Sequence, residues 1–369
     1  MKKKILIVGS GFAGAVIARE LANADLKVDL IEKKSHVAGN CYTKIDGDSG
    51  IMEHVYGPHI FNTDRKMIWE YINKFGELVP FINRVKCSIN KGIFSFPINL
   101  HTINQFFNKN FGPKQAKQFI ENIREKKIKN PKNFEEQALA FIGRDLYKAF
   151  FLGYTIKQWG CQPDQLPASI IKRIPIRFNY DDNYYNKKYQ AIPRNGYTEI
   201  IKNMLDHRNI NLSLKTQWKE FMINNYDYIF YSGPIDEFYD YRYGQLGYRT
   251  VYWKKKTIIG DYQGSAGINF SDLSVDHTRI YEHKHFTPWK KFKKSIVFKE
   301  YSKETSIKDI PFYPKRLAND NVLFNKYVEL SKKEKKIKFI GRLGTYRYLD
   351  MEDVIYESLI ISKKFLNKE

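Results

Sequence analysis

The sequence predicts an α/β protein in which a parallel sheet, assembled from separate stretches of the chain, is interrupted by an inserted helical domain and an antiparallel sheet domain. Three observations lead to this fold class. A β-branched strand, a glycine-rich turn, a helix and a second strand follow one another within residues 4–32. A basic helical pattern fills residues 101–150. Residues 246–300 alternate as β-structure, and a strand, a turn and a helix follow from residue 338.

Length and composition limit the class of protein. A chain of 369 residues is long enough for two or three domains. Its 43% of hydrophobic and 28% of charged residues exclude a disordered or collagen-like chain. The net charge of +22 has two interpretations, a solvated basic surface or an anionic partner. Such a partner would be nucleic acid, a membrane surface or a phosphorylated small molecule.

Neither an export signal nor a membrane-spanning helix is predicted. Residues 2–18 imitate a signal peptide, but three glycines interrupt the apolar run and Arg19-Glu20 follows it at once. No run of 18 apolar residues occurs elsewhere. The three scattered cysteines do not form a disulfide framework. We therefore expect a cytoplasmic protein with no integral membrane segment.

The first strand, helix and second strand form a βαβ unit. The apolar run 4–9 is typical of a strand buried on both faces, and the run 15–24 is a good helix. The second strand, 27–31, ends at Glu32, which stands 18 residues after Gly14. At this position a carboxylate accepts hydrogen bonds from ribose hydroxyls.

The glycine turn explains what the unit binds. Gly9 permits the tight turn, Gly11 lets the backbone approach a pyrophosphate, and Gly14 allows the helix to pack closely on the strand. The helix N-terminus offers free N–H groups at Gly11, Phe12 and Ala13 to phosphates. The sequence therefore predicts a Rossmann-like dinucleotide-binding domain.

Further elements follow from periodicity and turn residues. Residues 65–80 predict a helix, residues 85–97 a hairpin around Asn90–Gly92, and residues 226–231 a strand that returns to the nucleotide-binding sheet. The expected domains are a discontinuous nucleotide-binding domain, a helical domain and a sheet domain for the substrate. Their residues are 1–80, 191–240 and 316–369 for the first, 100–160 for the second, and 81–99, 161–190 and 241–315 for the third.

Several motifs resemble those of the bacterial UDP-galactopyranose mutases. Glu32 is followed by Gly39-Asn40 and then by the motif of residues 56–63. Where the family usually has two glycines before the asparagine, this chain has Ala38-Gly39. Further motifs fit in order along nearly the whole chain, at residues 154–160, 173–184, 277–283, 311–314 and 341–350.

The resemblance implies that the Rossmann-like domain binds FAD, with Arg342 donating charge-assisted bonds to its phosphates. It places His59 beside the flavin ring. The implied cofactor-binding residues are Gly9, Gly11, Phe12, Ala13, Gly14, Glu32, Lys33, Gly39, Asn40, His59, Arg342, Tyr348, Asp350 and Met351.

The resemblance also implies a UDP-sugar against the flavin. Arg173 and Arg279 match the family's diphosphate-binding arginines, and with His59 they are the implied catalytic residues. Trp159 matches the uracil platform, and the glycine- and proline-rich segment around it is expected to move as a lid. The implied substrate-binding residues are Asn83, Phe150, Phe151, Tyr154, Thr155, Trp159, Arg173, Tyr184, Asn269, Arg279, Tyr313 and Tyr348.

The implied activity is the interconversion of UDP-galactopyranose and UDP-galactofuranose for cell-surface polysaccharide synthesis. In this family the reduced flavin is the nucleophile, so FAD is active only when reduced, by NAD(P)H or another flavin reductant, and no net oxidation occurs. A homodimer is implied as well. No metal site is expected, because His283 and His285 are the only tight histidine pair and no third ligand is evident.

Two other classes remain open. A flavin-dependent oxidase or dehydrogenase of the amine-oxidase type would share the first 40 residues, but would not need two arginines and a base platform. A nucleic-acid-binding protein would explain the positive charge and the aromatic residues. We expect a nucleotide-sugar partner and no nucleic acid.

Overall fold

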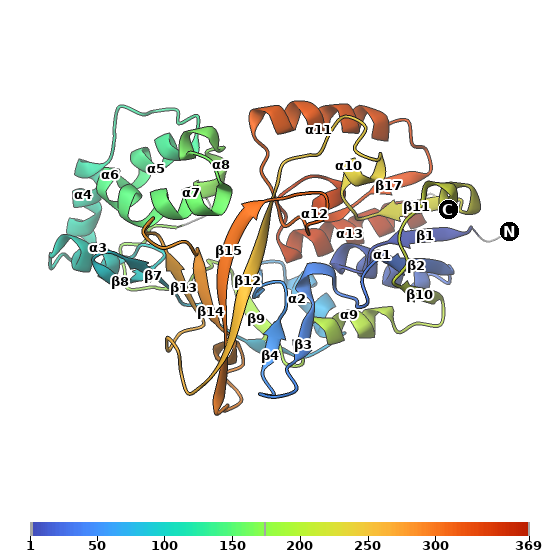
Figure 1. Ribbon diagram of the computed structural model, residues 1–369, viewed down its shortest axis with the longest axis horizontal. Helices are drawn as coiled ribbons and strands as arrows, with labels where there is room; N and C mark the ends of the chain where they lie inside the picture. Colours follow the sequence, from blue (N-terminus) through green and yellow to red (C-terminus); the bar gives the residue numbers. More distant parts are fainter. Residues whose placement is uncertain (1–2, 173–174, 368–369) are drawn as a thin grey trace.

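The structure is a computed structural model that describes residues 3–172 and 175–367 (Figure 1). A parallel sheet with the strand order β10-β2-β1-β11-β17 forms its nucleotide-binding part. Two parts of the chain far from the N-terminus complete this sheet, as predicted. The strands are β1 (Ile5–Val8), β2 (Val28–Glu32), β10 (Ile210–Leu214), β11 (Tyr228–Tyr231) and β17 (Ile337–Phe339).

Both faces of the parallel sheet are covered, which explains its nearly continuous apolar strands. Ile5 and Ile7 pack under the helices of one face, whereas Leu6 and Val8 join a cluster on the other. The first face carries α1 (Phe12–Asn23), α9 (Tyr197–Leu205) and α13 (Met351–Leu366), and the second carries a 3₁₀ turn (Glu220–Asn225) and α10 (Ile235–Phe238).

A seven-stranded sheet stands beside the parallel one, in the order β16-β12-β15-β14-β13-β7-β8. Only β13 and β7 pair in parallel; the other neighbours are antiparallel. The hairpin predicted around residues 90–92 is confirmed as β7 and β8. The strands are β7 (Val85–Ile89), β8 (Gly92–Phe96), β12 (Tyr248–Ile259), β13 (Gly267–Phe270), β14 (Arg279–Glu282), β15 (Lys294–Glu304) and β16 (Tyr313–Pro314).

A helical lobe packs on the β7–β8 end of this sheet, at the left of Figure 1. Its core joins strand residues Phe94 and Phe96 to Phe150 and Phe151 of the lobe. The lobe contains α3 (Leu100–Phe107), α4 (Pro113–Ile123), α5 (Phe134–Ile142), α6 (Arg144–Tyr147), a π-helical turn (Lys148–Leu152), α7 (Gly153–Trp159), a 3₁₀ turn (Pro163–Gln165) and α8 (Ser169–Lys172).

The remaining elements are short, apart from α11 (Ala318–Ser331). They are β3 (Thr43–Ile45), β4 (Met52–His54), β5 (Phe61–Thr63), β6 (Leu78–Pro80), β9 (Tyr189–Pro193), α2 (Lys66–Asn73), α11, α12 (Gly341–Gly344) and the 3₁₀ turns Gly39–Cys41 and His283–Phe286. Among the described residues, no helix combines the length and the apolar character needed to cross a membrane. The domain boundaries given above remain a prediction.

The helix predicted over residues 65–80 is wrong at its end. α2 stops at Asn73, and Leu78–Pro80 forms β6, paired with β9. A Cβ added at Gly76 would lie 3.0 Å from Cγ1 of Ile200, so the chain passes close to α9 at this point. That close approach is a tertiary contact, which periodicity does not report.

Two histidines are buried where β4 meets the turn after β14. His54 and His283 are 1% and 0% exposed, and the backbone N–H of His54 donates to Nδ1 of His283 at 3.2 Å. Burial lowers the pKa of His283 to about 3 and lowers the pKa of His54 well below its usual range. Both rings are therefore neutral in the folded protein at neutral pH.

We expect acid to destabilise the fold through these rings. Between about pH 6.5 and pH 3 the two histidines bind protons in the unfolded state but stay neutral in the folded state. The free energy of unfolding therefore falls as the pH drops. Each ring contributes at most about 1.4 kcal/mol per pH unit. Urea unfolding between pH 7 and pH 4 would measure this slope. His283→Asn, which keeps an acceptor for His54, should give a shallower slope, whereas an equal slope would contradict the assignment.

Candidate functional site

The glycine turn lies at the carboxyl end of β1. Gly9 has φ +98°, and a Cβ added there would overlap Oγ of Ser232. A Cβ on Gly14 would overlap the carbonyl oxygen of Gly9. These two positions therefore exclude side chains for internal reasons, since the turn and the helix α1 could not otherwise meet.

Gly11 is different, because its surroundings leave room for a ligand. It begins α1 in an extended conformation, and a Cβ there would lie 3.9 Å from Cα of Gly39. No side chain caps the first turn of α1 in the described structure. Its free N–H groups and the positive end of the helix dipole therefore meet the gap beside Gly39. This cradle fits the pyrophosphate of a dinucleotide.

The second side of the cradle is a turn under strain. Ala38 has φ +75°, a left-handed conformation that favours glycine, and its N–H donates to the carbonyl of Ser10 at 3.0 Å. The conformation explains why two glycines suit this turn better than the Ala38-Gly39 of the present chain. The altered dipeptide keeps the turn but adds local strain.

Glu32 lies beside the turn, as predicted. Its carboxylate accepts hydrogen bonds from N and Oγ of Ser10 and from N of Lys34, each at 2.9 Å. Lys33 points elsewhere, with its Nζ 3.3 Å from Glu237. Lys34, which was not predicted, donates to Oδ1 of Asn40 at 3.1 Å, and burial lowers its pKa to about 8. Of the two lysines, Lys34 and not the predicted Lys33 therefore lies beside Asn40.

The C-terminal part of the predicted cofactor site lies near His59. The Arg342 guanidinium donates to the carbonyl of Leu349 at 2.6 Å and lies 5.0 Å from the ring of Tyr348. Burial and then Arg342 lower the pKa of His59 to about 4. The neutral ring donates from Nδ1 to the carbonyl of Gly57 at 2.8 Å, so its Nε2 is an acceptor. Asp350 and Met351 begin α13.

The predicted arginine Arg279 stands at the start of β14, with its side chain 25% exposed. Its Nε donates to the hydroxyl of Tyr154 at 2.7 Å, and its Nη1 donates to the hydroxyl of Tyr281 at 2.6 Å. Glu300, which is 2% exposed, lies 3.2 Å from Nε. Burial alone would lower the pKa of Arg279, but Glu300 and the phenols raise it well above its usual value. Its Nη2 has no partner among the described residues.

A row of aromatic rings leads to Arg342 from α7, the helix that also carries Tyr154 of the arginine cluster. Trp159 lies 6.4 Å from Tyr313, which stacks on Tyr348 at 5.6 Å and 10°. Arg342 stands at the far end, 6.0 Å from the ring of Tyr313. Burial raises the pKa of Tyr313 and of Tyr154, so both phenols keep their protons and can donate. The predicted nucleotide side and cofactor side are thus continuous.

Other predicted substrate residues are placed at varying distance from this row. Phe150 lies inside the helical lobe between Phe94 and Phe106, at 5.4 and 5.5 Å, which makes it a core residue. Asn269 is the cross-strand partner of Arg279. The carbonyl of Asn83 accepts from N of Tyr184 at 2.9 Å.

Two more of the predicted substrate residues are buried, and a third lies where the structure describes nothing. Phe151 is 5.7 Å from Phe96, and Thr155 is buried in α7. Arg173 lies outside the described residues.

Comparison with known proteins decides the family. Residues 149–348 match the family described as UDP-galactopyranose mutase, and residues 7–75 match an NAD(P)-binding Rossmann-like domain. A probable UDP-galactopyranose mutase of Klebsiella pneumoniae is 50% identical over 365 residues, which cover 99% of this chain and 95% of that protein. The chain belongs to the UDP-galactopyranose mutase family.

Two further comparisons refine this assignment. A dTDP-fucopyranose mutase of Escherichia coli is 46% identical to this family member, with 99% of this chain and 100% of that protein covered. A crystal structure of reduced UDP-galactopyranose mutase superposes with a TM-score of 0.79 at 14% identity, covering 100% and 96% of the two chains. The predicted α/β fold with its Rossmann-like domain and antiparallel sheet is confirmed. These relatives do not decide which nucleotide sugar this chain converts, because they are named for two different ones.

Sequence reasoning missed part of the arginine cluster of this mutase. Glu300 and Tyr281 hold Arg279, yet neither was predicted. Glu300 stands directly opposite Arg279 in the pairing of β14 and β15. The sequence of β15 gives no distinguishing signal, because Glu300 is one of several charged residues in that strand and its partner is distant along the chain. Without the sheet register the sequence does not identify the pair.

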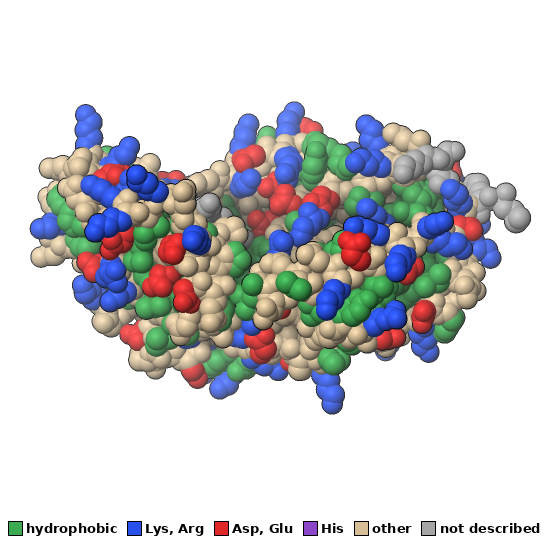
Figure 2. Space-filling view, turned by 90° about the horizontal axis from the view of Figure 1, so that it is seen from above, with side chains coloured by type: hydrophobic (Ala, Val, Ile, Leu, Met, Phe, Trp, Pro, Cys, Tyr) green, Lys and Arg blue, Asp and Glu red, His purple; other side chains and the backbone are tan. Residues whose placement is uncertain are grey.

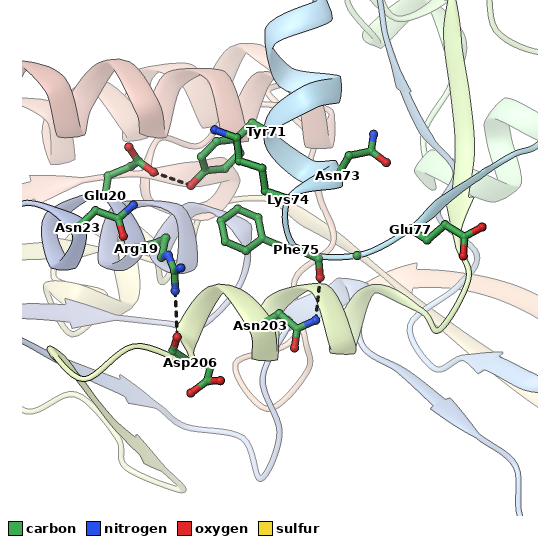
Figure 3. A pocket seen from close by; sticks show the side chains of 11 residues that line it. Arg19, Glu20, Asn23, Tyr71, Asn73, Lys74, Phe75, Glu77, Asn203 and Asp206 are labelled. Atoms are coloured by element: carbon green, nitrogen blue, oxygen red, sulfur yellow. Dashed lines mark hydrogen bonds between the residues drawn. The ribbon is translucent and has the colours of Figure 1, made fainter.

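A surface hollow of about 970 Å³ lies elsewhere and contains none of the predicted site residues. Figure 3 shows Arg19 donating to the carbonyl of Asp206 and Tyr71 donating to Glu20 across it. It is formed where α1, α2 and α9 end, at the opposite end of α1 from Gly11. About 12 Å of helix, from Gly11 to Arg19, therefore separates it from the glycine cradle. The hollow is lined by Arg19, Glu20, Asn23, Tyr71, Asn73, Lys74, Phe75, Gly76, Glu77, Asn203 and Asp206.

One group of potential metal ligands gathers near β14. Atoms of Asp261, Glu282 and His285 lie within 4.8 Å of one another. The ammonium of Lys284 is 2.9 Å from Asp261 and already supplies a positive charge there. Three backbone N–H groups and Ser295 donate to Glu282. These contacts describe a structural ion-pair group.

The basic surface shows no gathered stripe on the face drawn in Figure 2. Lys and Arg side chains are spread over it and alternate with Asp and Glu. The same view shows a hollow between the helical lobe and the rest of the molecule. This distribution favours a solvated surface over a track for nucleic acid.

We expect Gly11→Val to abolish dinucleotide binding while leaving the fold intact. The backbone of Gly11 has φ −73°, which valine adopts without strain, so the side chain would fill only the pyrophosphate's place. Nucleotide released on denaturation would be identified and quantified by chromatography. Gly47→Val is the matched control, because a Cβ there meets nothing within 4 Å. A Gly11→Val protein that retains its nucleotide would place the cradle elsewhere.

Proposed function

We propose that the protein is an FAD-dependent mutase that interconverts UDP-galactopyranose and UDP-galactofuranose without net oxidation. The observation that carries this proposal is the path from Arg279 to Tyr154 of α7, and from Trp159 of the same helix through Tyr313 and Tyr348 to Arg342. It would align a nucleoside diphosphate with a bound dinucleotide. The Klebsiella relative, named a probable UDP-galactopyranose mutase, supports the choice of substrate.

The cradle formed by Gly11, Gly39 and Glu32 fits FAD. In our proposal Gly11 and the first turn of α1 hold the pyrophosphate, while Glu32 holds the ribose. Lys34 and Arg342 add positive charge near the phosphates. When bound and reduced, the flavin supplies a nucleophilic nitrogen for the anomeric carbon of the sugar.

The substrate's diphosphate is assigned to Arg279. Its charge is permanent and its Nη2 is uncommitted within the described part of the chain, so it can pair with a phosphate oxygen. Charge in a buried site interacts more strongly than in water, which stabilises the nucleoside diphosphate as a leaving group. We assign Arg173 to the same diphosphate as the second arginine.

The aromatic groups hold the nucleotide end and the sugar. Stacking of uracil on Trp159 is worth about 1–3 kcal/mol. The protonated phenols of Tyr313 and Tyr154 donate to diphosphate or sugar oxygens. His59 is neutral, and its Nε2 accepts a hydrogen bond from a hydroxyl of the sugar or from the flavin edge.

The dTDP-fucopyranose mutase of Escherichia coli, at 46% identity over its full length, favours a second candidate substrate. Uracil and thymine both stack on an aromatic ring, and both nucleotides present a diphosphate to Arg279. The nucleotide sugar of this chain is therefore to be decided by measurement. A homodimer and reduction by NAD(P)H remain predictions.

Turnover of matched substrates by the reduced and the oxidised enzyme tests the proposal. The dithionite-reduced enzyme should convert UDP-galactofuranose to UDP-galactopyranose, followed by chromatography, with no reductant consumed per turnover. The oxidised enzyme should be inactive. Turnover by the oxidised enzyme, or loss of one NAD(P)H per product, would contradict the mechanism. A higher kcat/KM for dTDP-fucofuranose than for UDP-galactofuranose, measured in the same direction, would assign the second substrate.

A further inference from the structure

Lys157 of α7 is held in an unusual environment. Its Nζ lies 2.8 Å from the carbonyl oxygen of Phe270, 2.7 Å from that of Asp272, 3.1 Å from that of Val275 and 2.9 Å from that of His277. An ammonium group has three N–H donors, so the four carbonyls saturate it. No carboxylate takes part in these four bonds.

All four carbonyls belong to residues 270–277, the segment that joins β13 to β14. The hydrogen bonds of the ammonium therefore hold this segment in a tight bend and fix it to α7. Taking a charged amine out of water is costly unless its donors are satisfied, and the carbonyls offset that cost. Burial lowers the pKa of Lys157 to about 8, which leaves the group charged at neutral pH.

Other contacts tie the two ends of α7 to the sheet. A Cβ on Gly153 would overlap the carbonyl of Ser271, so helix and segment touch there. At the other end the carbonyl of Gln158 accepts from Nε of Arg249 at 2.9 Å and from Oγ of Ser302 at 2.7 Å. These contacts anchor α7 itself, and the lid expected around Trp159 remains a prediction.

The anchored helix carries Tyr154, which contacts Arg279, and Trp159. The hydroxyl of Tyr154 accepts a hydrogen bond from Nε of Arg279. Arg279 lies two residues after the segment 270–277 that Lys157 binds. We propose that Lys157 is a positioning residue that locks α7 onto residues 270–277, so that Tyr154 and Trp159 stand at a fixed distance from Arg279 before a nucleotide arrives. The choice of nucleotide in the test below rests on the proposed function.

Nucleotide affinity is the first readout. In the reduced holoenzyme, Lys157→Met should raise the Kd for UDP about tenfold or more, and should raise KM more than it lowers kcat. Bound flavin should be unchanged. Lys157→Arg keeps the charge but not the compact ammonium, so it should restore affinity only in part. Lys148→Met, at an exposed lysine in the preceding turn, is the matched control.

Hydrogen exchange of the holoenzyme without substrate is the second readout, and it does not depend on the identity of the nucleotide. Lys157→Met should speed exchange in peptides covering α7 and residues 266–280, with no change in the parallel sheet. Gly153→Ala, which pushes the helix from Ser271 without touching Lys157, should do the same. It also serves if Lys157→Met fails to fold.

The outcomes separate the two proposals. Wild-type exchange and wild-type UDP affinity in Lys157→Met would overturn the positioning role. Faster exchange spread uniformly over the whole chain would overturn it as well, because the lysine would then stabilise the fold in general and not α7 in particular. If the wild type binds neither UDP nor dTDP, the proposed function fails, and the exchange pattern still decides the role of Lys157.

Discussion

The ion pair between the buried Glu300 and the partly exposed Arg279 is the interaction on which the arrangement around β14 depends. A charged group cannot be taken out of water without partners, because losing its hydration costs several kcal/mol. Glu300 supplies the counter-charge from the adjacent position on β15, and Tyr154 and Tyr281 accept from the guanidinium N–H groups. The register of β14 against β15 and the placement of α7 must both be correct for this set to exist.

The predicted cofactor site around the glycine turn is formed mainly by backbone atoms and not by side chains. Gly9 and Gly14 let a strand, a turn and a helix meet, and Gly11 leaves a gap at the positive end of α1. The stacked pair of Tyr313 and Tyr348 spans the distance between this backbone site and the arginine cluster. Each of the two therefore sets one end of the ligand path, and the aromatic row sets the spacing between them.

How far the sequence could predict this arrangement depends on how local each signal is. The glycine turn and Glu32 are encoded within residues 4–32, where spacing alone indicates strand, turn and helix, and this part was predicted well. Arg279 and Tyr154 were found only through resemblance to a family. Glu300 was missed because its role depends on strand register. The end of α2 was misplaced because Gly76 packs closely against Ile200, a residue more than a hundred positions away in the sequence.

The central claim is that the positive charge of Arg279 binds the diphosphate of the substrate and not its base. The sharpest measurement compares the Kd of UDP with that of uridine for the wild type and for Arg279→Met combined with Glu300→Gln, which removes the charge pair without leaving one partner alone. The account predicts that UDP binds about tenfold or more weakly to the double variant, while uridine, which lacks phosphate, binds as before. Equal losses for both ligands, or an unchanged Kd for UDP, would contradict it.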